Sequence, residues 1–109
     1  TEGGLGLSTG QRQRIALARA LLGSPLLLLL DEVDANLDWQ ASKIIDRIIA
    51  THHGTILLAT HQINHIRAAD IVWYLEEGQL IESGSPDKIL NRNGPTANFL
   101  GLHKKSVVN

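Results

Sequence analysis

Two adjacent carboxylates, Asp31 and Glu32, directly follow the short apolar run 26–30. The run is bounded by a turn and is too short for an ordinary helix, so we expect a strand that is buried on both faces. Ligands of α/β proteins gather at the carboxyl ends of such strands. Magnesium prefers oxygen ligands, so Asp31 suits the ion, directly or through water, and Glu32 suits activation of an attacking water. On their own, the two residues are more typical of solvated carboxylates in a turn.

A second polar group, Ser8-Thr9-Gly10-Gln11, opens a stretch of helix-forming residues that reaches Leu22. The N-terminus of a helix attracts anions, and Gly10 would let the backbone approach a phosphate closely. Ser8 adds a hydroxyl donor. Because Ser and Gly also cap helices without any ligand, these residues alone predict either a phosphate site or an ordinary helix cap.

His61 directly follows the apolar run 56–60, which is expected to be a strand. An imidazole at that position could reach a phosphate and sense its loss. With His65 it forms an H-x-x-x-H spacing, but the chain has no cysteine, and no glutamate stands at the metalloprotease position. Metal binding by this pair is therefore disfavoured. Solvent-facing turns are expected for the other histidines, which are His52, His53 and His103.

Taken in order, these groups resemble the C-terminal half of the ATPase domain of ABC transporters, in its exporter branch. The run 7–11 is similar to the family's signature motif Leu-Ser-Gly-Gly-Gln, with Thr9 in place of one glycine. That motif touches the γ-phosphate of the ATP held by the opposite subunit. The run 26–32 resembles the Walker B strand, and 59–61 resembles the switch-histidine loop. The resemblance implies that Glu32 is the general base.

The segment after the carboxylates is similar to the D-loop of the same family, which couples two ATP sites across a dimer seam. Its residues here are Ala35, Asn36, Leu37 and Asp38. Many exporters have Ser-Ala-Leu-Asp at this place, so the chain lacks a hydroxyl that could contact the partner. Asp38 is also suited to cap the helix that follows.

The resemblance extends over residues 2 to about 102, because the run 66–84 is similar to the segment that follows the switch histidine in transporters. It implies the C-terminal part of a P-loop NTPase (RecA-like) three-layer α/β domain, with a mostly parallel sheet and a terminal hairpin. It also implies a parent protein that hydrolyses ATP with Mg²⁺ to move a substrate across a membrane. The implied partners are an N-terminal ATPase lobe, a second ATPase domain packed head to tail, and membrane domains. The implied location is the cytoplasm, at the inner face of the cell membrane.

The glycine-rich lysine loop G-x-x-x-x-G-K-[ST], which cradles ATP phosphates, does not occur in this sequence. At 109 residues the chain is also too short for a complete ATPase domain. We therefore expect a fragment that alone neither binds ATP tightly nor hydrolyses it. Without the lysine-loop (Walker A) strand, the strand before His61 would have an open edge, so we expect partial folding or self-association, including strand exchange.

Two alternatives to a transporter stay open. Chromosome-maintenance and repair ATPases of the same superfamily also carry signature, Walker B and histidine motifs in a C-terminal lobe, and the run 31–35 is similar to theirs. They usually have Glu after the signature glycine, whereas the run 11–14 is similar to transporters. The other alternative is a natural half-domain that binds a partner without catalysis.

The elements that must position these residues follow from hydrophobic periodicity and turn residues. The expected helices span 11–22, 38–50, 86–90 and 96–102. The expected strands span 26–30, 55–60, 71–75 and 79–82, and the last two form a hairpin. We expect three segments: the signature loop and helix in 1–25, the Walker B, D-loop, histidine and hairpin regions in 26–83, and the C-terminal helices and tail in 84–109.

The composition disfavours several other classes of protein. Ten Lys plus Arg against eleven Asp plus Glu leave a formal net charge of −1, so the sequence has no basic field for nucleic acid, and no nucleic acid is expected as a partner. The absence of cysteine excludes a disulfide framework and a cysteine nucleophile. The longest apolar run, 25–30, is far shorter than the roughly 20 residues that span a bilayer.

Overall fold

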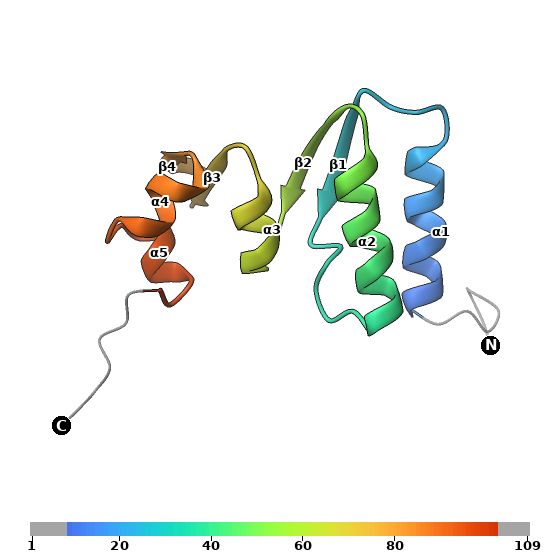
Figure 1. Cartoon of the computed structure of the whole chain (residues 1–109), viewed down its shortest axis with the longest axis horizontal. Coiled ribbons are helices and arrows are strands. Elements are labelled where there is room, and N and C mark those ends of the chain that lie inside the picture. The colour runs from blue at the N-terminus through green and yellow to red at the C-terminus, as the bar shows by residue number, and fades with distance from the viewer. Residues whose placement is uncertain (1–8, 103–109) are drawn as a thin grey trace. The chain divides into compact units, whose positions relative to one another are not determined.

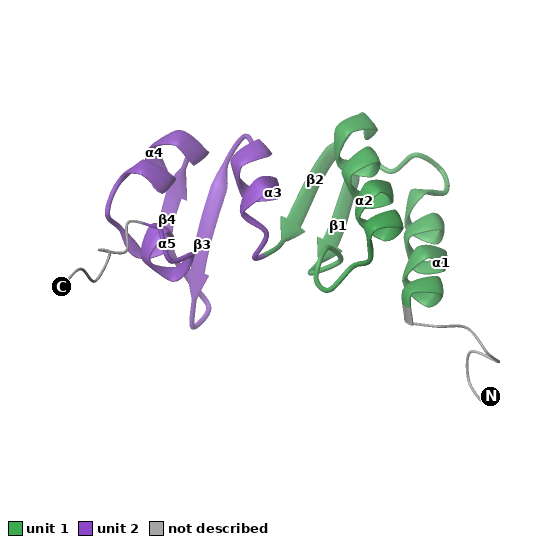
Figure 2. Ribbon diagram, turned by 60° about the horizontal axis from the view of Figure 1, so that its bottom comes forward, with its two compact units in different colours: residues 1–60 green, residues 61–109 purple. Residues whose placement is uncertain are grey.

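A computed structural model describes residues 9–102 of the chain, which form a mixed α/β structure (Figure 1). The chain divides after Thr60 into two compact units, which Figure 2 draws in different colours. None of the helices in residues 9–102 combines the length and the apolar character that a membrane crossing requires.

Unit 1 alternates helices and strands in the order that the sequence predicts. Its elements are α1 (Thr9–Leu21), β1 (Leu27–Asp31), α2 (Trp39–Thr51) and β2 (Thr55–Ala59). The two strands are parallel, and their register pairs Leu27 with Thr55 and Asp31 with Ala59. Asp31 and Ala59 therefore lie side by side at the carboxyl end of the two strands.

The core of unit 1 lies between the two helices and one face of the sheet. Its buried side chains are Leu17 of α1, Leu28 and Leu30 of β1, and Ile45 and Ile48 of α2. On the opposite face of β1, Leu27 and Leu29 are 53% and 64% exposed. The prediction that this strand is buried on both faces is therefore wrong within unit 1, because α1 and α2 cover only one of its two apolar faces.

Unit 2 combines a β-hairpin with three short helices. Its elements are α3 (Ile63–Ala68), β3 (Val72–Glu76), β4 (Gln79–Gly84), α4 (Pro86–Asn91) and α5 (Pro95–Phe99). The strands are antiparallel, and the turn residues Glu77 and Gly78 both have positive φ, 50° and 74°. Such a pair is typical of the two-residue type I′ turn. The core of this unit consists of Ile66, Val72, Ile89 and Leu90.

The α/β class and the terminal hairpin are confirmed. Helix α3 was not predicted, and the helix expected over 96–102 ends at Phe99. Within residues 9–102 the strands form one parallel pair and one antiparallel pair, each in its own unit. The three-layer arrangement and the missing Walker A strand stay predictions.

Candidate functional site

The two carboxylates that the sequence singles out lie at the carboxyl end of strand β1. Asp31 is the last residue of β1, and Glu32 directly follows it. The backbone N–H of Glu32 donates a hydrogen bond to the carbonyl oxygen of Ala59, at 2.8 Å. Both carboxylate residues are exposed. Carboxylate oxygens are ligands of the kind that Mg²⁺ prefers, so the side chains at this end of the sheet could hold that ion.

The backbone of Glu32 is in the left-handed region, with φ 52°. A residue with a Cβ pays about 1–2 kcal/mol for this conformation. Two hydrogen bonds hold it: the bond to Ala59, and one at 3.3 Å from the Ala35 N–H to the Glu32 carbonyl. Residues in such conformations cluster at functional sites. Nothing in the sequence signals this feature of Glu32.

Asp34 is a carboxylate of this region that the sequence-based site left out. It is 6% exposed, and its carboxylate accepts a hydrogen bond from the hydroxyl of Thr60. Thr60 directly follows β2, so this bond connects the loop after one strand with the end of the next. The feature of the sequence that could have indicated this bond is Thr60 itself, which directly follows β2, the parallel neighbour of β1.

Helix α1 reaches the loop after β1 through two side chains. The side-chain amide of Gln13 donates a hydrogen bond to the carbonyl of Val33. The guanidinium of Arg14 lies 3.7 Å from the carboxylate of Asp38, in a pair whose side chains are 38% and 67% exposed. An exposed pair of this kind contributes little stability, so the Gln13 bond is the more specific connection.

The predicted signature residues fall at the start of α1. Ser8 lies outside the described residues, and Thr9, Gly10 and Gln11 form the first turn of the helix. The first N–H groups of an α-helix have no acceptor within the helix itself, so this end of the 13-residue helix α1 attracts anions. The contacts of Gln13 and Arg14, one turn further on, connect this same helix with the segment after β1.

The predicted D-loop residues connect β1 with α2. Asn36 has φ 54°, and Leu37 packs against the core of unit 1. Asp38 is the N-cap of α2, where its carboxylate accepts a hydrogen bond at 2.8 Å from the N–H of Ala41. The capping role expected for Asp38 is thus confirmed.

His61 is the first residue of unit 2 and is described within that unit. Its ring centroid lies 5.5 Å from that of Phe99, the last residue of α5. The structure therefore groups Asp31, Glu32 and residues 35–38 in unit 1 and places His61 in unit 2. No three His, Cys, Asp or Glu side chains within residues 9–102 are grouped as a metal site.

Comparison with known proteins agrees with these motifs. The family model described as ABC transporter matches residues 1–35. ABC transporter B family member 16 of Arabidopsis thaliana is 37% identical over 105 residues, which cover 94% of this chain and 9% of that protein. The solved structure of a bacterial Atm1-family ABC exporter with ATP bound matches with a TM-score of 0.78 and 35% identity, over 90% of this chain and 18% of that one. The chain belongs to the ABC transporter family.

Another relative of this ABC transporter chain is the exotoxin translocation ATP-binding protein PaxB of Pasteurella aerogenes. It is 40% identical over 96 residues, which cover 85% of this chain and 14% of PaxB. The chain spans between 8% and 14% of the length of the curated relatives that it matches. The exporter-like ATP-binding resemblance predicted from the motifs is confirmed.

Proposed function

We propose that this chain is part of the ATP-hydrolysing domain of an ABC transporter, which powers movement of a substrate across a membrane. The observation that carries the proposal is the pair Asp31 and Glu32, both exposed at the carboxyl end of β1, with Glu32 held in a left-handed conformation against Ala59. The relatives described above are transporters. For this reason we favour transport over chromosome maintenance and over a non-catalytic binding module.

Within this proposal, the two carboxylates have different roles. Asp31 holds Mg²⁺, directly or through water, and the ion neutralises charge on the phosphate oxygens when it is bound. Glu32 is the general base, which takes a proton from the attacking water. Its backbone, held by hydrogen bonds on both sides, restricts where the carboxylate can reach. His61 contacts the γ-phosphate and responds to its loss.

The remaining site residues serve a dimer of ATPase domains. Ser8, Thr9, Gly10 and Gln11 contact the ATP held by the opposite subunit, because the N–H groups at the start of α1 attract phosphate. Residues 35–38 line the seam between the two domains. The partners are an N-terminal ATPase lobe, a second ATPase domain and the membrane domains, at the cytoplasmic face of the cell membrane.

The chain alone lacks the lysine loop that cradles phosphates, so we propose that it neither binds ATP tightly nor hydrolyses it. Isothermal titration calorimetry of the chain with ATP and Mg²⁺ tests this statement. We expect no saturable heat of binding. Micromolar binding by the monomer would contradict the proposal.

The role of Glu32 is tested by Glu32→Gln in a complete ATPase domain that carries this chain. Loss of a general base lowers turnover by roughly 10²–10⁴-fold, while ATP-dependent dimerisation should persist. The matched control is Glu77→Gln, because Glu77 is also exposed and also has a positive φ, of 50°, directly after a strand. Near-normal turnover of the Glu32 variant would refute the assignment.

The signature residues are tested separately by Ser8→Arg in the same domain. A bulky cation at this position should fill the space of the γ-phosphate and block ATP-dependent dimerisation. Size-exclusion chromatography with and without ATP measures the effect. A variant that still dimerises on ATP would count against a signature loop at residues 8–11.

A further inference from the structure

In unit 2 the ring of Phe99 lies in contact with two other rings, those of His61 and Tyr74. His61 precedes α3, Tyr74 lies in β3, and Phe99 is the last residue of α5. The ring centroids of His61 and Phe99 are 5.5 Å apart, with planes inclined by 37°. Those of Tyr74 and Phe99 are 5.6 Å apart, with planes inclined by 52°. Both separations are in the range of favourable ring pairs, so Phe99 bridges the other two rings.

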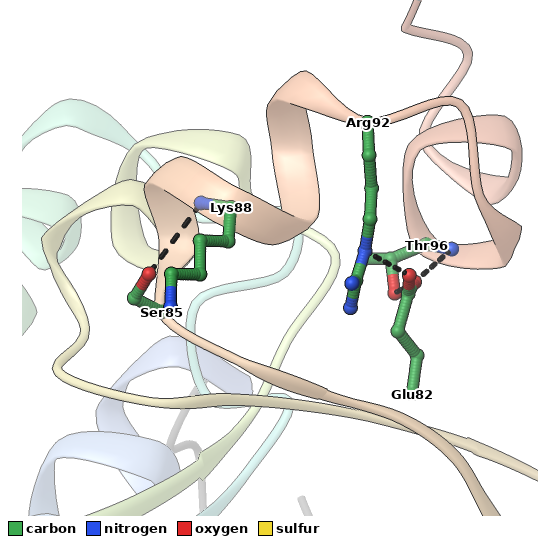
Figure 3. A network of polar contacts seen from close by, with 5 residues as sticks. All are labelled: Glu82, Ser85, Lys88, Arg92 and Thr96. Atoms are coloured by element: carbon green, nitrogen blue, oxygen red, sulfur yellow. Dashed lines mark hydrogen bonds and ion pairs between the residues drawn. The ribbon is translucent and has the colours of Figure 1, made fainter.

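The helix that carries Phe99 is fixed to the hairpin by a polar network (Figure 3). The Glu82 carboxylate accepts hydrogen bonds from the N–H and the hydroxyl of Thr96, at 3.0 and 2.6 Å. It also pairs with Nε of Arg92 at 2.7 Å. The Glu82 side chain is 8% exposed and Thr96 is 4% exposed, so the two bonds between these residues are largely shielded from water, whereas the Arg92 side chain is 51% exposed. Because Thr96 and Phe99 belong to the same short helix, the network also fixes the backbone of Phe99.

The ring of Phe99 has little part in the core of unit 2. Phe99 is 54% exposed, whereas the core residues Ile89 and Leu90 are 0% and 6% exposed. Its ring–ring contacts are with His61 and Tyr74. An exposed imidazole has several rotamers, and contact with a neighbouring ring selects among them.

We propose that Phe99 is a positioning residue for His61, and that Tyr74 supports the Phe99 ring from β3. This inference rests on the role in ATP turnover proposed above for His61. A side chain held near its productive geometry loses less conformational freedom when it meets a phosphate, so turnover gains from the contact. Helix α5 thereby restricts the ring of His61, a residue that is far from the helix in the sequence.

The contact itself is tested in the 109-residue chain by NMR of the histidine ring protons. The Phe99 ring should shift the His61 resonances, and Phe99→Leu should remove this shift, whereas Phe99→Tyr should keep it. Trp73→Leu is the matched control, because Trp73 is also 54% exposed and belongs to the same unit. It should leave the His61 resonances unchanged. Identical His61 resonances in the wild type and in Phe99→Leu would overturn the inference.

The consequence for function is tested in a complete ATPase domain, with His61→Ala as the reference. Phe99→Leu should lower kcat by about twofold to tenfold with little change in KM. Phe99→Tyr keeps an aromatic ring and should have the kcat of the wild type. Phe99→Met, which keeps the size of the side chain without the ring, should repeat the loss if Phe99→Leu folds poorly. If His61→Ala leaves turnover intact, the proposed role of His61 fails. If His61→Ala lowers turnover but both ringless Phe99 variants do not, the positioning role fails.

Discussion

The hydroxyl of Thr60 donates a hydrogen bond to the carboxylate of Asp34. Asp34 lies in the loop after β1 and is 6% exposed, whereas Thr60 is half-buried, so the bond is partly shielded from solvent. The preceding residue of the same loop, Val33, accepts a hydrogen bond from Gln13 of α1. The segment next to Asp31 and Glu32 is thus held from β2 on one side and from α1 on the other.

Replacing Thr60 with valine should destabilise unit 1 by about 1–3 kcal/mol, because a buried carboxylate loses a hydrogen-bond donor. Urea unfolding can be followed by the fluorescence of Trp39, which belongs to unit 1, in a Trp73→Phe background. Thr55→Val is the control, because Thr55 is exposed in β2, and it should change stability little. Equal stability of the Thr60 and Thr55 variants would show that the bond contributes nothing.

The left-handed conformation of Glu32 predicts that function and stability conflict at this residue. Glycine adopts φ near 52° without a steric penalty, so Glu32→Gly should stabilise unit 1 by about 1 kcal/mol. The same change removes the proposed base and should abolish turnover in a complete domain. Asp31→Gly is the control, because glycine within a strand should destabilise. A less stable Glu32→Gly variant, measured by the same urea unfolding, would argue against strain at Glu32.

Most elements were predictable from the sequence because their hydrophobic patterns are local. The predicted bounds of α1, β1, α2 and β2 differ from the observed bounds by a few residues at most. Helix α3 was missed because its six residues are too few to show helical periodicity. The exposure of Leu27 and Leu29 was missed because an apolar pattern shows only that both faces of a strand are hydrophobic. It does not show whether other elements pack against both faces.

The candidate site was predictable only in part, for a related reason. Asp31 and Glu32 stand out because they are adjacent in the sequence at the end of an apolar run. The bond between Thr60 and Asp34 and the contact between Phe99 and His61 join residues far apart in the sequence. Such contacts depend on strand register and on the packing of α5, neither of which follows from local patterns.

The cap of α2 predicts different effects for two substitutions of Asp38. Asp38→Ala removes the acceptor for the Ala41 N–H and should cost about 1 kcal/mol of stability. Asp38→Asn keeps a good N-cap and loses only the exposed pair with Arg14, so its effect should be small. Circular dichroism during thermal unfolding compares the two variants. Equal losses would mean that the charge of Asp38 matters more than its capping bond.

The uncovered face of the β1–β2 sheet predicts self-association of the isolated chain. Leu27, Leu29 and Leu57 are 53%, 64% and 46% exposed, and apolar residues on a strand with an open edge favour pairing between copies. Light scattering after size-exclusion chromatography should detect a dimer or a larger species. Leu29→Lys should shift the population toward monomer, whereas Ile44→Lys, at an exposed position of α2, should not. A monomeric wild-type chain would rule out this prediction.

The Glu82 network predicts that unit 2 loses stability in acid. The hydrogen bond from the Thr96 hydroxyl, together with the Thr96 N–H and the charge of Arg92, lowers the pKa of Glu82 below its ordinary value of 4.5, although burial acts in the opposite direction. Because the pKa is lower in the folded chain than in the unfolded one, the stabilisation is complete above about pH 4.5. It is lost progressively as the pH falls from there through the folded pKa.

Glu82→Gln removes the titrating group, so this variant should be less stable than the wild type near neutral pH, and its stability should fall less in acid. Both effects are measured by thermal unfolding from about pH 7 to about pH 3. The fluorescence of Trp73 is followed in a Trp39→Phe background. Glu77→Gln is the control, because Glu77 is exposed. Parallel declines of the wild type and Glu82→Gln below pH 4.5 would mean that another group causes the acid sensitivity.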